Sequence, residues 1–112
     1  MGVRSAADLL NHPRSGASWE GFALEQVLRL AEPDEAYFWA THGGAELDLL
    51  LLRGQRRVGV EFKRADAPRL TPSMFIAQRD LRLDALYVVY PGARRFQLAD
   101  GIEAVPLSAL LT

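Results

Sequence analysis

The stretch LDLLLLRGQRRVGVEFK, residues 47–63, decides the fold of this 112-residue chain. Two runs rich in leucine and valine flank Gly54-Gln55, and glycine-containing dipeptides of this kind close tight hairpin turns. The stretch therefore predicts two neighbouring antiparallel strands. We expect the first strand over Glu46 to Arg53 and the second over Arg57 to Lys63.

Charged side chains interrupt this apolar hairpin. Because side chains alternate along a strand, we expect Glu46, Asp48 and Leu50 to share one face of the first strand. Glu61 and Lys63 would likewise share one face of the second, and the hairpin would bring Asp48 close to Glu61, depending on the register. Two neighbouring carboxylates repel each other unless a cation lies between them. Carboxylate oxygens suit Mg²⁺ or Mn²⁺, so the hairpin predicts a divalent metal site.

Lys63 is the only lysine among thirteen basic residues. Lysine carries a compact charge whose pKa can shift, whereas arginine presents a broad planar fork. A divalent metal site of this kind could serve metal-assisted hydrolysis of a phosphodiester. In that reaction Lys63 would orient the metal-activated water or stabilise charge on the scissile phosphate. The simpler interpretation is a salt bridge between Glu61 and Lys63 on a strand face, and the i, i+2 spacing alone favours it. The presence of a single lysine favours instead a metal-dependent hydrolytic site. Asp48 and Glu20, an acid on a predicted helix upstream of the hairpin, favour it as well.

The rest of the chain predicts helices and strands around this hairpin. Apolar residues spaced by threes and fours predict a helix from about Ser15–Ser18 to Ala31, with Glu20 near its N-terminal end beside the apolar stripe. Thr71 before Pro72 predicts a capped helix that ends near Leu83. The order is αβββαβ with a small tail, which predicts a central mixed sheet flanked by helices. Further strands are predicted over 37–40, 85–90, 96–98 and 102–105, a helical turn over 107–111 and the end of a helix over 6–11.

An acid on one strand followed by acid-x-Lys on the next resembles the hallmark of the PD-(D/E)xK nuclease superfamily. That resemblance implies a restriction-endonuclease-like αβββαβ core. It also implies that Asp48 and Glu61 are metal ligands, that Lys63 is the catalytic lysine, and that Glu20 is the helix acid that completes the metal shell. Leu47 stands where the hallmark has proline.

The chain is similar, over residues 12–111, to a domain of unknown function found C-terminal to the ATPase module of prokaryotic AAA-type ATPases. This resemblance implies an ATPase partner, either in the same chain or in another. The chain has no GxxxxGK[ST] motif, so it holds no ATPase site of its own. The phrases that carry the resemblance are HPRSGASWEGFALEQ, FWATHGGAELDLLL, VGVEFKRADAPRLT and LYVVYPG.

The distribution of charge predicts a basic surface. Net charge is −1, but residues 1–52 carry three bases and eight acids, whereas residues 53–112 carry ten bases and six acids. A basic face binds phosphates, so we expect DNA as a partner. The alternative is ordinary solvated arginine on the surface. The expected DNA-binding residues are Arg53, Arg56, Arg57, Arg64 and Arg69.

Length and composition limit the remaining possibilities. The 112 residues predict a single domain over 1–112, and no run approaches the roughly 20 apolar residues that span a bilayer. The N-terminal segment lacks the long apolar stretch of a signal peptide, so we expect a cytoplasmic protein without membrane association. The chain has no cysteine, which excludes disulfides and thiolate metal sites. The oligomeric state stays open, with a homodimer as one arrangement.

The sequence therefore leads to two hypotheses. The first is a nuclease-like domain that uses Mg²⁺ or Mn²⁺ to hydrolyse DNA, or that binds DNA. The second is a catalytically idle module that positions an ATPase or a protein partner. Fold does not decide between them, because function depends on the site.

Overall fold

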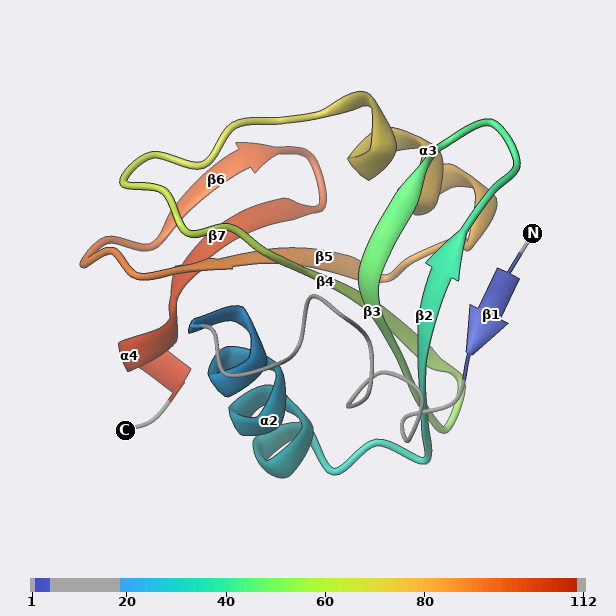
Figure 1. Cartoon of the computed structure of the whole chain (residues 1–112), viewed down its shortest axis with the longest axis horizontal. Coiled ribbons are helices and arrows are strands. Elements are labelled where there is room, and N and C mark those ends of the chain that lie inside the picture. Colours follow the sequence, from blue (N-terminus) through green and yellow to red (C-terminus); the bar gives the residue numbers. More distant parts are fainter. Residues whose placement is uncertain (1, 5–18, 111–112) are drawn as a thin grey trace.

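Strands β3 (Glu46–Arg53) and β4 (Arg56–Phe62) form the predicted hairpin at the centre of a seven-stranded sheet (Figure 1). The structure is a computed structural model that describes residues 2–4 and 19–110. Gly54 in the turn has a φ of 61°, a left-handed conformation that glycine adopts without steric cost. The hairpin thus forms where the sequence predicts it.

The sheet is mixed, with strand order β1-β2-β3-β4-β5-β7-β6. Strands β1 to β4 are antiparallel neighbours, whereas β4, β5 and β7 run parallel. Parallel neighbours need a crossover connection, and helix α3 provides the one between β4 and β5. The other strands are β1 (Gly2–Arg4), β2 (Glu35–Ala40), β5 (Ala85–Tyr90), β6 (Phe96–Ala99) and β7 (Ile102–Pro106).

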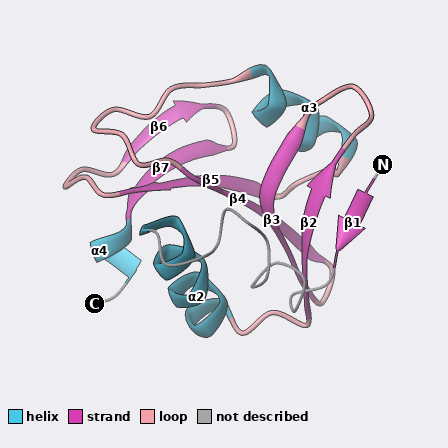
Figure 2. Cartoon of the chain, in the orientation of Figure 1, coloured by secondary structure: helices cyan, strands magenta, loops and turns pink. Residues whose placement is uncertain are grey.

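Helices cover both faces of the sheet (Figure 2). Helix α2 (Trp19–Ala31) and the short α4 (Leu107–Leu110) pack on one face, over a core that includes Leu49 and Val60. Helix α3 (Pro72–Asp80) packs on the other, where Met74 and Ala77 meet a second core. The strands in the middle are therefore buried on both sides, as their near-continuous apolar sequences require.

The fold is a mixed α+β architecture, and α2-β2-β3-β4-α3-β5 reproduces the expected order of elements. Several details differ from expectation. Strand β1 was not predicted, because three residues give no readable alternation. Helix α3 ends at Asp80 rather than Leu83, because the chain leaves the helical conformation at Arg82, which has a left-handed φ of 52°. Thr71 occupies the N-cap position, but its side chain makes no capping hydrogen bond. The predicted helix end over 6–11 lies outside the described residues.

The expected alternation along β3 is wrong at one point. Leu49 and Leu51 lie in the core beneath α2, as alternation requires, but Leu47 lies with Leu50 in the core beneath α3. The pairing of β3 with β2 shifts register in the same stretch, between the partners of Tyr37 and Trp39. A bulge of this kind inserts one extra residue and reverses the direction of the side chains beyond it. The irregularity falls beside Asp48, at the end of the hairpin that carries the candidate site.

Candidate functional site

Asp48 and Glu61 meet where β3 and β4 separate. The regular pairing runs from Arg53 opposite Arg56 to Leu49 opposite Val60, and Asp48 lies one position further, across from Glu61. The backbone N–H of Asp48 donates a hydrogen bond to Oε1 of Glu61, at 2.8 Å. The expected approach of these two acids is therefore found.

The Asp48 carboxylate makes the reciprocal contact. Its Oδ2 accepts a hydrogen bond from the backbone N–H of Phe62, at 2.9 Å. Each carboxylate thus occupies the place that a backbone carbonyl of the opposite strand fills in a regular ladder. Hydrogen bonds to a charged acceptor are stronger than those between neutral groups. These two bonds allow the strands to separate without leaving buried N–H groups unsatisfied.

Glu61 is the one charged residue among the buried residues of the described chain, with 6% of its surface exposed. Burial of a carboxylate is costly unless hydrogen bonds or opposite charges compensate it. Here Oε1 receives the backbone hydrogen bond of Asp48, and Oε2 lies 3.8 Å from Nζ of Lys63. Both carboxylate oxygens of Glu61 are therefore held by groups within the hairpin stretch.

Lys63 lies on the same side of the sheet as Glu61. Val60 and Phe62 point into the core beneath α2, so alternation places Glu61 and Lys63 on the opposite face, the one that α3 covers. The backbone N–H of Lys63 donates to the carbonyl of Val89 on β5 at 2.9 Å, which fixes the chain just beyond β4. The Lys63 side chain is 36% exposed, so it is reachable from solvent while it faces Glu61.

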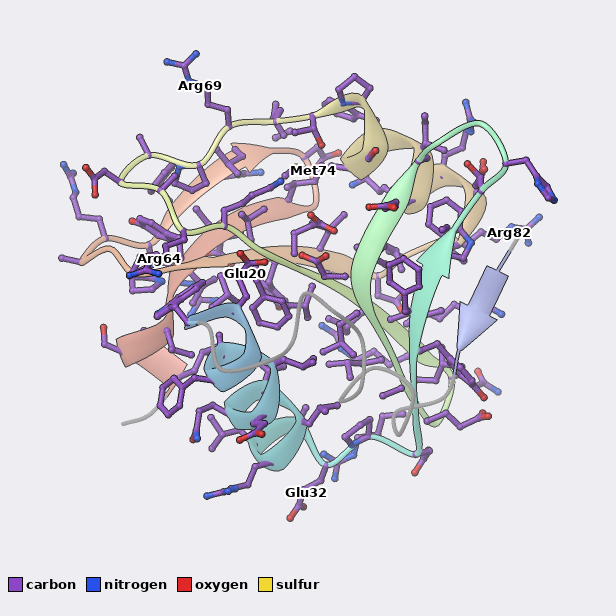
Figure 3. All side chains as sticks on the ribbon, in the orientation of Figure 1. Glu20, Glu32, Arg64, Arg69, Met74 and Arg82 are labelled. Atoms are coloured by element: carbon purple, nitrogen blue, oxygen red, sulfur yellow. The ribbon has the colours of Figure 1, made fainter. Side chains whose placement is uncertain are left out.

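Glu20 lies in the first turn of α2 (Figure 3). It is half-buried, but α2 packs on the face opposite Glu61 and Lys63. Within the described residues, no group of three His, Cys, Asp or Glu side chains is arranged to hold a metal ion. The structure thus brings Asp48 and Glu61 together and does not join Glu20 to them in a three-carboxylate set.

The arginines expected to bind DNA divide between the two ends of β4. Arg53 and Arg56 lie at the hairpin turn, and Arg57 there donates to the carbonyl of Leu81 at 3.0 Å. The other two, Arg64 and Arg69, follow Lys63 on the loop that leads to α3 (Figure 3). Strand β4 spans roughly 20 Å between the two groups, at about 3.3 Å per residue. Only the second group follows the end of β4 that carries Glu61.

Gly59 allows close packing beside the two acids, although no sequence pattern marked it as a site residue. It precedes Glu61 by two residues and so points to the same face. A Cβ atom at this position would lie 2.7 Å from Cδ1 of Leu83 and 3.2 Å from Cδ2 of Leu47. The glycine therefore lets these leucines pack directly against β4 beside the acids. The signal was a glycine inside an apolar strand, which commonly marks close packing against the backbone.

Gln78 on α3 makes its contact away from the two acids. Its Nε2 donates to the carbonyl of Asp100 at 2.8 Å, and this bond ties α3 to the turn between β6 and β7.

None of the helices in the described part of the chain is both long and apolar enough to cross a membrane.

Comparison with known proteins identifies a family but no activity. Residues 15–110 match the family model described as "Domain of unknown function (DUF4143)". Two curated proteins, uncharacterized protein Rv2008c of Mycobacterium tuberculosis and uncharacterized protein Mb2031c of Mycobacterium bovis, are each 44% identical to the chain over all 112 residues. The chain spans 25% of the length of each of these relatives. No solved structure matches the chain significantly.

Proposed function

The chain belongs to the family described as Domain of unknown function (DUF4143), and from that premise we propose that it is a metal-dependent, nuclease-like domain that cleaves or binds DNA. We assign the αβββαβ portion to the restriction-endonuclease-like class. The observation that carries the proposal is the reciprocal pair of hydrogen bonds between Asp48 and the Glu61–Phe62 segment, with Lys63 beside Glu61. An ordinary strand-face salt bridge between Glu61 and Lys63 does not require Asp48.

The side chains present fit a divalent cation. Asp48 and Glu61 supply hard oxygen ligands from two adjacent strands, which is the chemistry that Mg²⁺ and Mn²⁺ prefer. Mg²⁺ keeps several waters and commonly uses one or two protein carboxylates, so two acids suffice to hold it at a phosphate site. Glu20, on the helix that packs against the other face of the sheet, is not needed for this two-carboxylate shell. The bound ion would polarise the scissile phosphate and lower the pKa of a bound water.

Lys63 supplies the positive charge that the reaction needs on the protein side. Its ammonium group is partly exposed and is held at 3.8 Å from Glu61, so the same group can contact an incoming phosphate. There it stabilises charge that builds on the phosphate oxygens, or it orients the attacking water. Glu61 keeps the ammonium in place between turnovers.

The DNA backbone would follow the loop after β4, which carries Arg64 and Arg69 (Figure 3). Arginine neutralises phosphates and releases the counterions condensed on DNA. A DNA substrate is consistent with the expected cytoplasmic location. The arginines at the hairpin turn lie at the other end of β4 and would contact a longer duplex only.

A second candidate function rests on the length of the relatives. Because this chain matches a quarter of each, a module that positions the remainder of a longer protein, such as an ATPase, is the alternative. Such a module would keep Asp48 and Glu61 for their hydrogen bonds across the strands alone. The two candidate functions differ in one respect that can be measured: only the nuclease requires a bound divalent cation for its activity.

The test is a plasmid-nicking assay with Mg²⁺, Mn²⁺ or a chelator, together with calorimetric titration of Mg²⁺. The nuclease proposal expects divalent-dependent nicking that Glu61→Gln and Lys63→Ala abolish and that Arg82→Gln retains. Arg82 is an exposed residue beyond the end of α3, so it serves as the charge-matched control. Absence of both metal binding and nicking would favour the positioning module.

A further inference from the structure

A second concave site lies on the face of the sheet opposite Glu61 and Lys63. It is a pocket of about 480 Å³ between α2, α4 and strands β3, β4, β5 and β7. The walls are mostly apolar, with Val27 and Leu30 from α2, Val58 and Val60 from β4, and Leu110 from α4. Pockets of this size and composition are typical of sites for small molecules.

Two arginines stand at the hairpin end of this pocket. Arg53 and Arg56 both line it, and they are directly opposite each other in the β3–β4 register. Like charges in directly opposed positions destabilise a pair of strands, so an anion between them would relieve that repulsion. This arrangement adds a charged end to an otherwise apolar pocket.

The arginines of the pocket differ in the partners they already have. Arg95 lies 2.6 and 3.0 Å from the two carboxylate oxygens of Glu103, so its charge is compensated. Arg53 donates through Nη1 to the carbonyl of Ala31 at the end of α2. The Arg56 side chain makes no hydrogen bond or ion pair with any residue that the structure describes. Arg56 is therefore the group best placed to accept a ligand anion.

We propose that this pocket binds a small monocarboxylate with an extended apolar body, of the kind represented by medium-chain fatty acids. The body would lie against the valine and leucine walls, and the carboxylate would reach Arg56, whose planar guanidinium can bind it through two parallel hydrogen bonds. A nucleic acid strand fits this pocket less well, because successive phosphates need cations along the whole site and the valine and leucine walls supply none. The inference goes beyond the proposed nuclease function and does not depend on it, since the pocket lies across the sheet from Glu61.

The test uses calorimetric titration of the 112-residue chain with octanoate, decanoate and 1-octanol, each below its aggregation or solubility limit. Saturable binding is expected for octanoate, with 1-octanol at least about tenfold weaker because it lacks the carboxylate. Decanoate should bind about fifteenfold more tightly than octanoate, since each buried methylene contributes about fourfold.

Variants test whether the carboxylate of the ligand binds Arg56 and whether its apolar body lies against the valine and leucine walls. Arg56→Gln should weaken octanoate at least about tenfold and leave 1-octanol unchanged, whereas Arg82→Gln should change neither. Val58→Phe narrows the pocket from β4 and should weaken both ligands, with circular dichroism and the melting temperature as checks of folding. The proposal is overturned if octanoate does not bind at millimolar concentration, if 1-octanol binds as tightly, or if Arg56→Gln and Arg82→Gln behave alike.

Discussion

The Asp48 and Glu61 carboxylates each accept a hydrogen bond from the backbone of the opposite strand. The N–H of Asp48 donates to the Glu61 carboxylate, and the N–H of Phe62 donates to the Asp48 carboxylate. The two side chains therefore serve the fold as well as any chemistry. Both bonds need an acceptor oxygen and neither needs a negative charge. Substitutions that separate these two properties give the sharpest test of the site.

Glu61→Gln and Glu61→Ala should differ strongly in stability. Glutamine keeps an oxygen for the N–H of Asp48 and removes a buried charge, so we expect the free energy of unfolding to stay within about 1 kcal/mol of the parent or to rise. Alanine leaves that N–H without its acceptor, and we expect a decrease of about 1–3 kcal/mol. Urea denaturation of both variants without divalent cations measures the difference. Equal decreases would show that the charge, rather than the acceptor, holds the strands.

Lys63→Arg tests whether Lys63 has a role beyond an ion pair. Arginine keeps the positive charge, but its flat, broad head cannot take the position of a compact ammonium group 3.8 Å from Glu61. We expect nearly unchanged stability, because arginine retains a positive charge beside the buried Glu61 carboxylate. Divalent-dependent nicking should disappear as fully as in Lys63→Ala. A Lys63→Arg protein that nicks at the parental rate would reduce Lys63 to a salt-bridge partner.

Binding to DNA should depend on salt and on the arginines of the loop that follows β4. We expect the double variant Arg64→Gln/Arg69→Gln to weaken duplex binding and to flatten the salt dependence, by about 0.9 in log–log slope for each phosphate that is no longer neutralised. Arg53→Gln/Arg56→Gln is the matched control at the far end of β4 and should retain most of the affinity for a short duplex. Fluorescence anisotropy across a salt series measures both. Equal effects of the two double variants would point to diffuse attraction.

The Arg95–Glu103 pair should make a small, pH-dependent contribution to stability. The hydrogen bond from Arg95 holds the pKa of the Glu103 carboxyl below its ordinary value of 4.5, with a smaller contribution from the charge of Arg95. A lowered folded-state pKa stabilises the fold above the unfolded-state value, and this stabilisation disappears as the pH falls through the folded-state pKa. Glu103→Gln should therefore melt slightly earlier at pH 7. The gap in melting temperature should close as the pH falls below 4.5, and a gap that persists in strong acid would contradict this origin.

The sequence predicted the hairpin and its acids because they depend on local signals. A glycine turn between two apolar runs specifies which strands pair, and a two-residue period specifies that Glu61 and Lys63 share a face. The bulge near Asp48 escaped prediction because it arises from the pairing of β3 with β2, which no local pattern records. The sequence predicted the position of Thr71 but not its missing side-chain bond, since capping also depends on the rotamer.

The same limit applies to the wider site. The helix that carries Glu20 was predicted from periodicity, but the face of the sheet on which it packs is decided by tertiary contacts. The five arginines were predicted as one DNA-binding set because residues 53–112 are rich in basic residues. The fold separates them into two groups, one at each end of β4. The pocket opposite the acids was not predicted either, because its walls come from several elements between residues 27 and 110. Features built from distant segments are those that sequence reasoning missed.

The hairpin origin of the two acids also has a kinetic consequence. Asp48 and Phe62 are separated by 14 positions, and hairpins form in about 1–10 μs, far faster than pairings between distant segments. The parallel pairing of β4 with β5 must first close the loop that contains α3. The two carboxylates therefore come together early in folding, before the sheet is complete. Under the proposed metal-dependent function, a divalent cation present at that stage would bind the hairpin of an unfinished protein and speed its folding. The pocket across the sheet would exist only after the last helix has docked.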